Sequence, residues 1–382
     1  MISPLSSVSP ERDAPANPTM SKETPRRPAR HRARARLIAF FALAALVAAS
    51  LAQAGCVKSY VNASPNLRWW LFSNFGAQHI CPEMLKRGAG LKLAPGGNII
   101  GRFFPDQCRY EINDPAKTLA VHFGGTGYAW TPVAGRMGFS ATMSVEYRPD
   151  FYLSDEAVYV WARFNRLIYG PDFKIGSVEN KVVDWAATQT PAGYLANTFG
   201  NQLVQSQLSS GFTVVRSDEG DDFSLGILQP PARPAHPFTT SGSDRYVFAN
   251  ETTEVRYGQV DFLGPFEVAD SDQALFLRFR AAGPEVEALV VTRGAGDRWR
   301  GSLQLGAPLG PPPESPLTGF RLPPAGEVRQ KLKLQPGQYY VVIDNSAAVG
   351  QVAPAWNPLA VVGGATTTVS YTAELGDADS SF

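Results

Sequence analysis

Few side chains in this sequence could carry acid–base chemistry, because the chain of 382 residues contains only 4 histidines. General acid–base catalysis needs a histidine that is held beside a partner in a pocket. His122 falls in a segment that alternates like a β-strand, and His236 falls among prolines. The sequence identifies no partner for either side chain. We therefore interpret both histidines as structural residues and predict that the chain is not an enzyme.

Acidic and glycine-rich clusters could instead bind cations or phosphate. The candidate cation ligands are Asp218, Glu219, Asp221, Asp222, Asp261, Asp270 and Asp272. Residues 218–222 lack the spacing of an EF-hand, so we interpret them as a solvated hairpin turn. The glycines within 124–127 precede Trp130 and Pro132 rather than a helix, which favours a β-turn over a phosphate loop. We expect no bound metal and no cofactor.

Residues 1–55 have the pattern of a targeting segment. A basic stretch at 26–36 is followed by an apolar run at 37–51 and then by small residues. This order is typical of a secretory signal peptide. The apolar run has 15 residues, fewer than the ~20 that a helix needs to span a bilayer. An uncleaved signal anchor is the alternative.

The residues that end at Cys56 resemble the lipobox of bacterial lipoproteins. Ala54 and Gly55 fit the pattern, whereas Gln53 departs from it. The resemblance implies that Cys56 becomes the lipidated first residue, whose acyl chains would anchor the protein stably. It also implies an outer-membrane location, because Val57 rather than aspartate follows Cys56. Cleavage after Ala54, which would give a secreted soluble or periplasmic protein, is the alternative.

Lipidation of Cys56 would leave Cys81 and Cys108 as an even pair in an exported chain. The residues between them are rich in glycine and proline, and closing such a loop contributes roughly 3 kcal/mol in the entropy model. We expect a disulfide between these two cysteines. Two free thiols are one alternative. A metal site with His79 and His122 is another, although its spacing matches no familiar zinc pattern.

Residues 118–250 are predicted to form an α+β domain with an antiparallel sheet and one amphipathic helix. Apolar and polar residues alternate at 119–123 and 139–147, and further strands are expected at 157–167, 173–178, 212–216 and 223–228. A helix with one apolar stripe is expected at 190–211. Long strands around one helix resemble periplasmic members of the tubular lipid-binding superfamily, which implies a hydrophobic ligand. The candidate lining residues are Met143, Val145, Phe199 and Leu203. An ordinary core is the alternative.

Residues 251–376 are predicted to form an all-β sandwich. Short strands are expected at 259–268, 274–280, 287–292, 299–305, 327–333, 339–344 and 366–374. The segment 334–344, with Pro336 and Gly337 before Tyr339 and Tyr340, resembles the closing strand of bacterial pre-peptidase C-terminal-like domains. This resemblance implies an accessory module without catalytic residues.

The distribution of charge completes the functional prediction. The net charge is +1, but residues 1–55 carry +5 and the remainder carries −4, which argues against nucleic-acid binding. The predicted order is a signal peptide with an N-terminal extension (1–55), a tether and disulfide-linked loop region (56–117), and the two domains. We predict a non-catalytic cell-envelope lipoprotein with a binding or scaffolding role. Its partners would be the membrane, through Cys56, and a lipid or an envelope protein. An exported hydrolase with an accessory sandwich is the alternative function.

Overall fold

The structure, a computed structural model, describes residues 56–92, 97–131, 135–179, 207–218, 220–240, 244–354 and 365–382. The described chain is mostly β-sheet, which confirms the predicted β-rich fold. In spatial order, the larger sheet contains β1 (Ala89–Leu91), β2 (Gly101–Asn113), β3 (Thr118–Thr131), β4 (Gly135–Leu153), β5 (Val158–Val178), β6 (Phe212–Ser217), β7 (Gly220–Leu225), β8 (Tyr246–Arg256), β15 (Thr366–Asp377), β10 (Gln273–Ala282) and β13 (Val328–Leu332). The smaller sheet contains β12 (Thr318–Leu322), β11 (Val286–Thr292), β14 (Gly337–Asn345) and β9 (Gln259–Val268).

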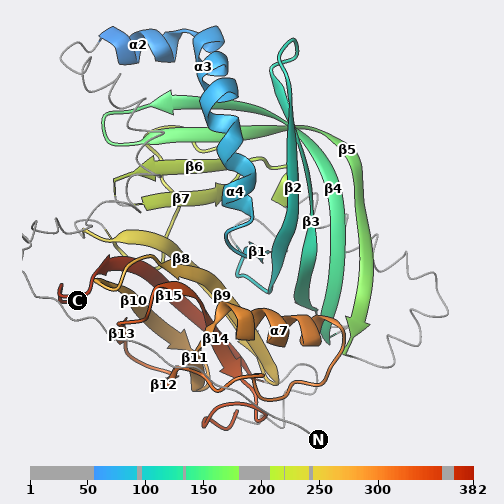
Figure 1. The fold of residues 1–382 in the computed structure, drawn as a ribbon, viewed down its shortest axis with the longest axis vertical. Coiled ribbons are helices and arrows are strands. Elements are labelled where there is room, and N and C mark those ends of the chain that lie inside the picture. Colours follow the sequence, from blue (N-terminus) through green and yellow to red (C-terminus); the bar gives the residue numbers. More distant parts are fainter. Residues whose placement is uncertain are drawn as a thin grey trace, which may run out of the picture.

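The long antiparallel strands β2 to β5 form the curved part of the larger sheet (Figure 1). Successive side chains point to opposite faces of a strand, so the apolar side chains of β3 and β4 gather on one face. Leu119, Val121, Phe139 and Val145 are buried there in a single core. The strands predicted at 119–123 and 139–147 are thus confirmed by β3 and β4. The two strands predicted at 157–167 and 173–178 are one continuous strand, β5.

Helical segments pack against this apolar face. They are α2 (Cys56–Ala63), α3 (Pro65–Leu71), a π-helical turn (Phe72–Gly76), a 3-10 turn (Ala77–His79) and α4 (Ile80–Met84). The Ser64 hydroxyl caps α3 by accepting a hydrogen bond from Leu67 N at 3.3 Å, and Pro65 occupies the first turn, where its missing N–H costs nothing. Phe72 and Ala77 are buried in the core formed with the strands. The region predicted as a tether and loop, 56–117, therefore begins with helical segments packed onto the sheet and continues into the strands β1 and β2.

A disulfide joins Cys81 of α4 to Cys108 of β2, with the two Cα atoms 5.3 Å apart. The predicted pairing is confirmed. The bond fixes the helical segment covalently to the curved sheet. Among the described helices, none combines the length and the apolar character needed to cross a membrane.

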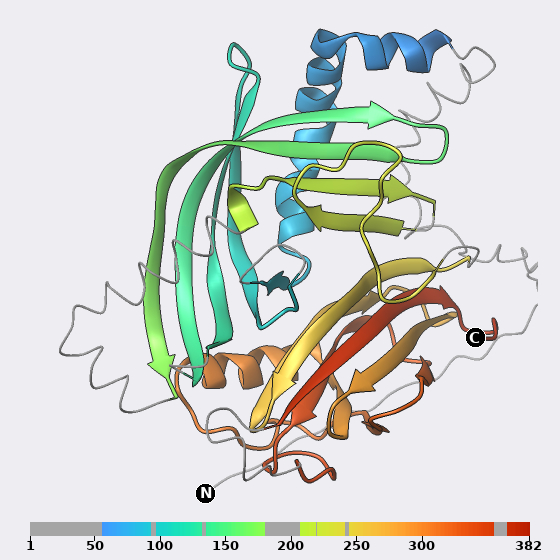
Figure 2. The same cartoon turned by 180° about the vertical axis from the view of Figure 1, so that it is seen from behind.

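The C-terminal part of the chain forms two facing sheets, seen from behind in Figure 2. Strands β8, β15, β10 and β13 pack against the smaller sheet around a core that includes Phe266 and Leu277. β9 has the predicted bounds, Gln259–Val268. One parallel pair, Gly220 with Val247, joins β7 to β8, so strands from both predicted domains belong to the same sheet. β8 crosses the boundary that was predicted at residue 250.

The strand predicted at 299–305 is wrong, because Arg293–Gln304 forms the helix α7. Thr292 is its N-cap, and the Thr292 hydroxyl accepts a hydrogen bond from Ala295 N at 3.3 Å. Ala295, Trp299 and Leu303 recur every four residues and are buried against the smaller sheet. The segment RGAGDRWRGSLQ contains 3 glycines, and glycine disfavours a helix. The four-residue spacing of its apolar side chains was therefore not recognised as helical.

Helix α7 also contacts the curved sheet, so it bridges the two parts of the fold. The Ser177 hydroxyl of β5 donates a hydrogen bond to the Gln304 carbonyl at 2.9 Å. A Cβ atom at Gly138 of β4 would collide with the same carbonyl, so this close approach requires glycine. α7 is therefore held between the long strands and the smaller sheet.

Candidate functional site

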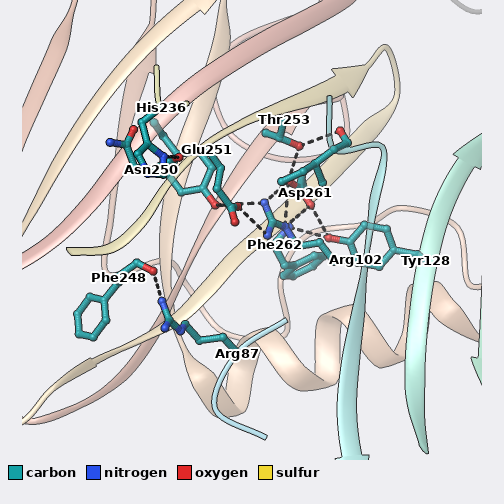
Figure 3. Close-up of polar contacts among 12 residues, drawn as sticks. Arg87, Arg102, Tyr128, His236, Phe248, Asn250, Glu251, Thr253, Asp261 and Phe262 are labelled. Carbon is teal, nitrogen blue, oxygen red and sulfur yellow. Dashed lines mark hydrogen bonds and ion pairs between the residues drawn. The ribbon is translucent and has the colours of Figure 1, made fainter. Parts of the chain in front are cut away.

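A buried ion pair lies where the long strands meet the facing sheets. Arg102 of β2 is 2% exposed and Asp261 of β9 is 4% exposed. Arg102 Nε donates to Asp261 Oδ1 at 3.0 Å and to Oδ2 at 3.2 Å, and Nη2 donates to Oδ2 at 3.2 Å (Figure 3). Each group satisfies the charge and hydrogen-bonding capacity of the other, which is what makes their burial tolerable.

Four more side chains complete a cluster that we call the clamp. Its members are Arg102, Asp261, Tyr128, Thr253, Glu251 and Tyr371. The hydroxyls of Tyr128 and Thr253 donate to Asp261 at 2.7 and 2.8 Å. The Tyr371 hydroxyl accepts from Arg102 at 3.2 Å and donates to Glu251 at 2.8 Å. The clamp therefore ties β2 and β3 to β8, β9 and β15.

The guanidinium of Arg102 and the hydroxyls of Tyr128 and Tyr371 keep their protons at neutral pH. Burial opposes the charge on Arg102, but the facing Asp261, together with Tyr371 and Glu251, raises the pKa of the guanidinium above its ordinary value. Burial also raises the pKa of the Tyr128 and Tyr371 hydroxyls. These groups bond mainly to one another in the protein interior, so we interpret the clamp as bracing rather than as a reactive centre.

A pocket of about 370 Å³ opens next to the clamp, between the loop after α4, the strands β2, β3, β9 and β14, and helix α7. The Phe104 ring in its wall lies 6.2 Å from the ring of Tyr128, a clamp residue. The charged lining residues are Lys86, Arg87, Arg293, Arg300, Asp106 and Asp297. Cations therefore outnumber carboxylates in this pocket.

The α7 side of the pocket holds two arginines around one carboxylate. Arg293 Nε lies 3.4 Å from Asp297 Oδ2, and Arg300 Nη2 lies 3.2 Å from Asp297 Oδ1. The Tyr340 hydroxyl donates to the same Oδ1 at 2.8 Å. Arg300 also donates to Thr126 Oγ1 at 3.1 Å, and its guanidinium carbon lies 4.0 Å from the centre of the Phe104 ring. The guanidinium of Arg300 is therefore held in place from several sides.

The loop after α4 carries the other two cations of the pocket lining. Lys86 Nζ lies 2.6 Å from Glu83 Oε1 of α4. Arg87 donates to the Phe248 carbonyl of β8, as Figure 3 shows. Within the part of the chain that the structure describes, no carboxylate oxygen lies within 4.0 Å of the Arg87 guanidinium.

Among the described residues, Met143 and Val145, which were predicted to line a hydrophobic-ligand cavity, do not line this pocket. Met143 and Val145 are buried in the core between the curved sheet and its helices. Phe199 and Leu203 lie outside the described residues, as does most of the helix predicted at 190–211. The four-residue lining therefore stays a prediction. Cys56 begins α2, and its lipidation likewise stays a prediction.

The two histidines singled out in the sequence, His122 and His236, both lie beside carboxylates, an arrangement that the sequence did not reveal. His236 Nε2 lies 3.1 Å from Asp222 Oδ1, and His236 Nδ1 lies 3.0 Å from the Asn250 carbonyl. The hydrogen bond to Asp222 raises the pKa of His236 against the opposing effect of burial. Asp221, the neighbouring acid of the predicted turn, pairs with Arg216. In the described residues no three His, Cys, Asp or Glu side chains form a metal-binding group.

His122 faces a serine on the adjacent strand. His122 Nδ1 lies 2.7 Å from Ser144 Oγ, and His122 Nε2 lies 3.7 Å from Glu111 Oε1. His122 and Ser144 are directly opposite each other in the register of β3 and β4. Ser144 is buried whereas Glu111 is exposed, so the three side chains lie on the sheet face without forming part of the pocket described above.

Sequence reasoning missed the pocket and most of the clamp. Asp261 is one of the predicted cation ligands, but it lies inside the buried strand β9 and pairs with an arginine. A carboxylate within the apolar run QVDFLGPFEV is itself a signal, because a buried charge needs a partner. The partner, Arg102, is 159 positions away in the sequence and could not be named without the topology.

Comparisons with known proteins add little. No family model matches this sequence, and no curated protein matches it. Among solved structures, a glycoside hydrolase family 43 arabinoxylan arabinofuranohydrolase from Bacillus subtilis, in complex with cellotetraose, is 8% identical. The alignment covers 72% of this chain and 67% of that chain with a TM-score of 0.19. This likeness is too weak to support an inference about the fold or the function.

Proposed function

We propose that this protein is a non-catalytic binding protein of the cell envelope, anchored to the outer membrane through a lipid on Cys56. The observation that carries the binding role is the pocket of about 370 Å³ at the meeting point of the curved sheet, α7 and the smaller sheet. Ligand sites are typically preformed clefts of this size in which a few polar groups converge. The neighbouring clamp joins β2, β3 and β9, three of the strands that line the pocket. In this proposal the α+β region and the sandwich are two domains that share the site.

The geometry next to Cys56 supports the anchor. Cys56 is the first residue of α2, so a lipid on it would be joined directly to a folded helix. Arg68 of the following helix forms an ion pair with Asp150 of β4 at 2.7 Å, which fixes the segment to the sheet. Tyr60 and Trp70 are 67% and 52% exposed, and exposed aromatic side chains favour a membrane surface. The body of the protein would therefore lie close to the bilayer.

Replacing the cysteine, Cys56→Ser, is expected to abolish the anchor without unfolding the protein. In a bacterial host, the wild type should incorporate radiolabelled palmitate and sediment with membranes, whereas the variant should do neither. Both proteins should melt at the same temperature after detergent extraction. A wild-type protein that starts at Gly55 and carries no acyl group would show instead that the chain is cut after Ala54 and is not lipidated.

An exported hydrolase is the second candidate function, and one observation favours it. His122 lies between a serine and a carboxylate, 2.7 Å from Ser144 Oγ and 3.7 Å from Glu111 Oε1. A base and a carboxylate in this order can activate a serine nucleophile. The hydrolase predicts that a fluorophosphonate probe labels the wild type and that Ser144→Ala abolishes this labelling. Ser209→Ala provides a control at a serine outside this cluster. Absence of labelling in the folded wild-type protein would remove the support for this second function.

A further inference from the structure

We infer that the pocket binds a small organic anion, namely a molecule with a ring or apolar body and one carboxylate or phosphate group. This inference rests on the proposed binding function and names its ligand class. The residues that line the pocket include 4 basic and 2 acidic ones. Such an excess of positive charge in a cleft with apolar walls raises the local concentration of anions.

The pairing of these charges leaves cationic groups available to a ligand. Arg293 and Arg300 share the single carboxylate of Asp297. Arg87 has a carbonyl rather than a carboxylate as its partner among the described residues. A guanidinium matches the oxygen pairs of carboxylates and phosphates, so these arginines provide the positive charge that an anion needs.

The same pocket offers an apolar wall for the body of the ligand. Phe104, Pro105, Pro265 and Leu85 line it together with the ring of Tyr340. Arg300 is already stacked on Phe104 and bonded to Thr126, so little side-chain freedom is lost when it binds an anion. The volume accommodates a molecule of about the size of a sugar acid.

Asp297 gives the inference a test that loss of folding cannot imitate. The Asp297 carboxylate forms ion pairs with Arg293 and Arg300, the two arginines that would bind the ligand anion. It therefore competes with the ligand for them. Asp297→Asn removes this competing charge, while the amide oxygen can still accept the hydrogen bond from Tyr340. The variant should therefore bind an anion more tightly than the wild type. A variant that simply misfolds would bind more weakly.

The experiment is isothermal titration of the purified mature protein with glucuronate, glucose and inorganic phosphate. Glucose is the neutral match of glucuronate and should not bind, whereas glucuronate should bind and should bind more weakly as salt is raised. Phosphate distinguishes a phosphate site from a carboxylate site. Arg293→Gln should weaken anion binding by about 10-fold or more and Asp297→Asn should strengthen it by a similar factor. Arg298→Gln, on the same helix but paired with Glu314, is the matched control.

Three outcomes would overturn the inference: glucose binding as tightly as glucuronate, no heat from either anion, or unchanged affinity in both Arg293→Gln and Asp297→Asn. The labelling of Cys56 is measured separately, so the two proposals can fail independently. Anion binding by a protein that is not lipidated would support the ligand class and reject the anchor. A lipidated protein that binds neither anion would reject the ligand class and keep the anchor.

Discussion

Arg102→Met is expected to lower the free energy of unfolding by about 3–5 kcal/mol, because removing one partner strands a charge in the protein interior. Asp261 would remain 4% exposed and would keep only the hydroxyl donors of Tyr128 and Thr253. Glu251 would also lose its cationic neighbour. The chain contains 7 tryptophans, so urea unfolding followed by their fluorescence measures the loss.

Arg109→Met is the matched control for this prediction. It makes the same change on the same strand, β2, but Arg109 is exposed and its ion pair with Glu111 is exposed as well. Exposed pairs contribute about 0–1 kcal/mol, so the control should unfold nearly as the wild type does. Equal losses in the two variants would show that the clamp does not brace the fold. The double variant Arg102→Met with Asp261→Asn should recover part of the loss, because it removes both charges.

Strand positions could be predicted well wherever one face of a strand is buried and the other is polar. β4 shows the alternation FSATMSVEY, and its apolar members lie in the core as expected. β9 was predicted with its observed bounds because Gly258 precedes it and the polar turn residues 270–272 follow it. Such local patterns predict strands well because the side chains on one face of the strand must be apolar to be buried.

Other elements were missed because their local signals are weak or conflicting. β2 reads GRFFPDQCRYEIN, in which Pro105 and scattered charged residues conceal a strand. A register shift between Pro105 and Gln107 lets the strand tolerate this proline in its pairing with β3. In α7 the glycines masked a four-residue period that tertiary packing enforces. In both cases neighbouring elements, rather than local propensity, decide the conformation.

The candidate site was the least predictable part, because its residues come from distant segments. The loop after α4, β2, α7 and β14 all contribute side chains to the pocket. A single arginine in a predicted loop does not indicate a binding site. It does so only when the fold is known to place an aromatic ring or a second arginine beside it. The disulfide could be predicted because counting cysteines needs no topology.

Asp344→Asn is expected to abolish a large part of the pH dependence of stability. Asp344 of β14 is 2% exposed and lies opposite Glu287 of β11, which is also buried. Burial raises the pKa of Asp344 to about 7, and the nearby charge of Glu287 adds to this effect. The Ser346 N–H donates to Asp344 Oδ1 at 3.0 Å, a bond that the asparagine oxygen can retain. The substitution therefore removes the titration with little change in shape.

The sign follows from proton linkage. An aspartate with a pKa near 3.8 in the unfolded chain and about 7 in the folded protein binds its proton more tightly when folded. Wild-type stability should therefore be highest below the unfolded pKa and should fall as pH rises to about 7, by at most about 4 kcal/mol. The pKa of His236 is also raised, so its contribution to stability is likewise lost as pH rises. The pKa values of Glu146 and Glu327 are lowered, so their contributions to stability are lost only as pH falls into the acid range.

The difference between variant and wild type isolates Asp344 from these other groups. Measured by urea unfolding, Asp344→Asn should gain stability relative to the wild type between about pH 5 and about pH 8, by up to about 3 kcal/mol. Asp379→Asn makes the same change at a side chain that is 95% exposed and should show a constant difference over this range. A constant difference for Asp344→Asn as well would mean that burial against Glu287 does not hold a proton on this carboxyl group.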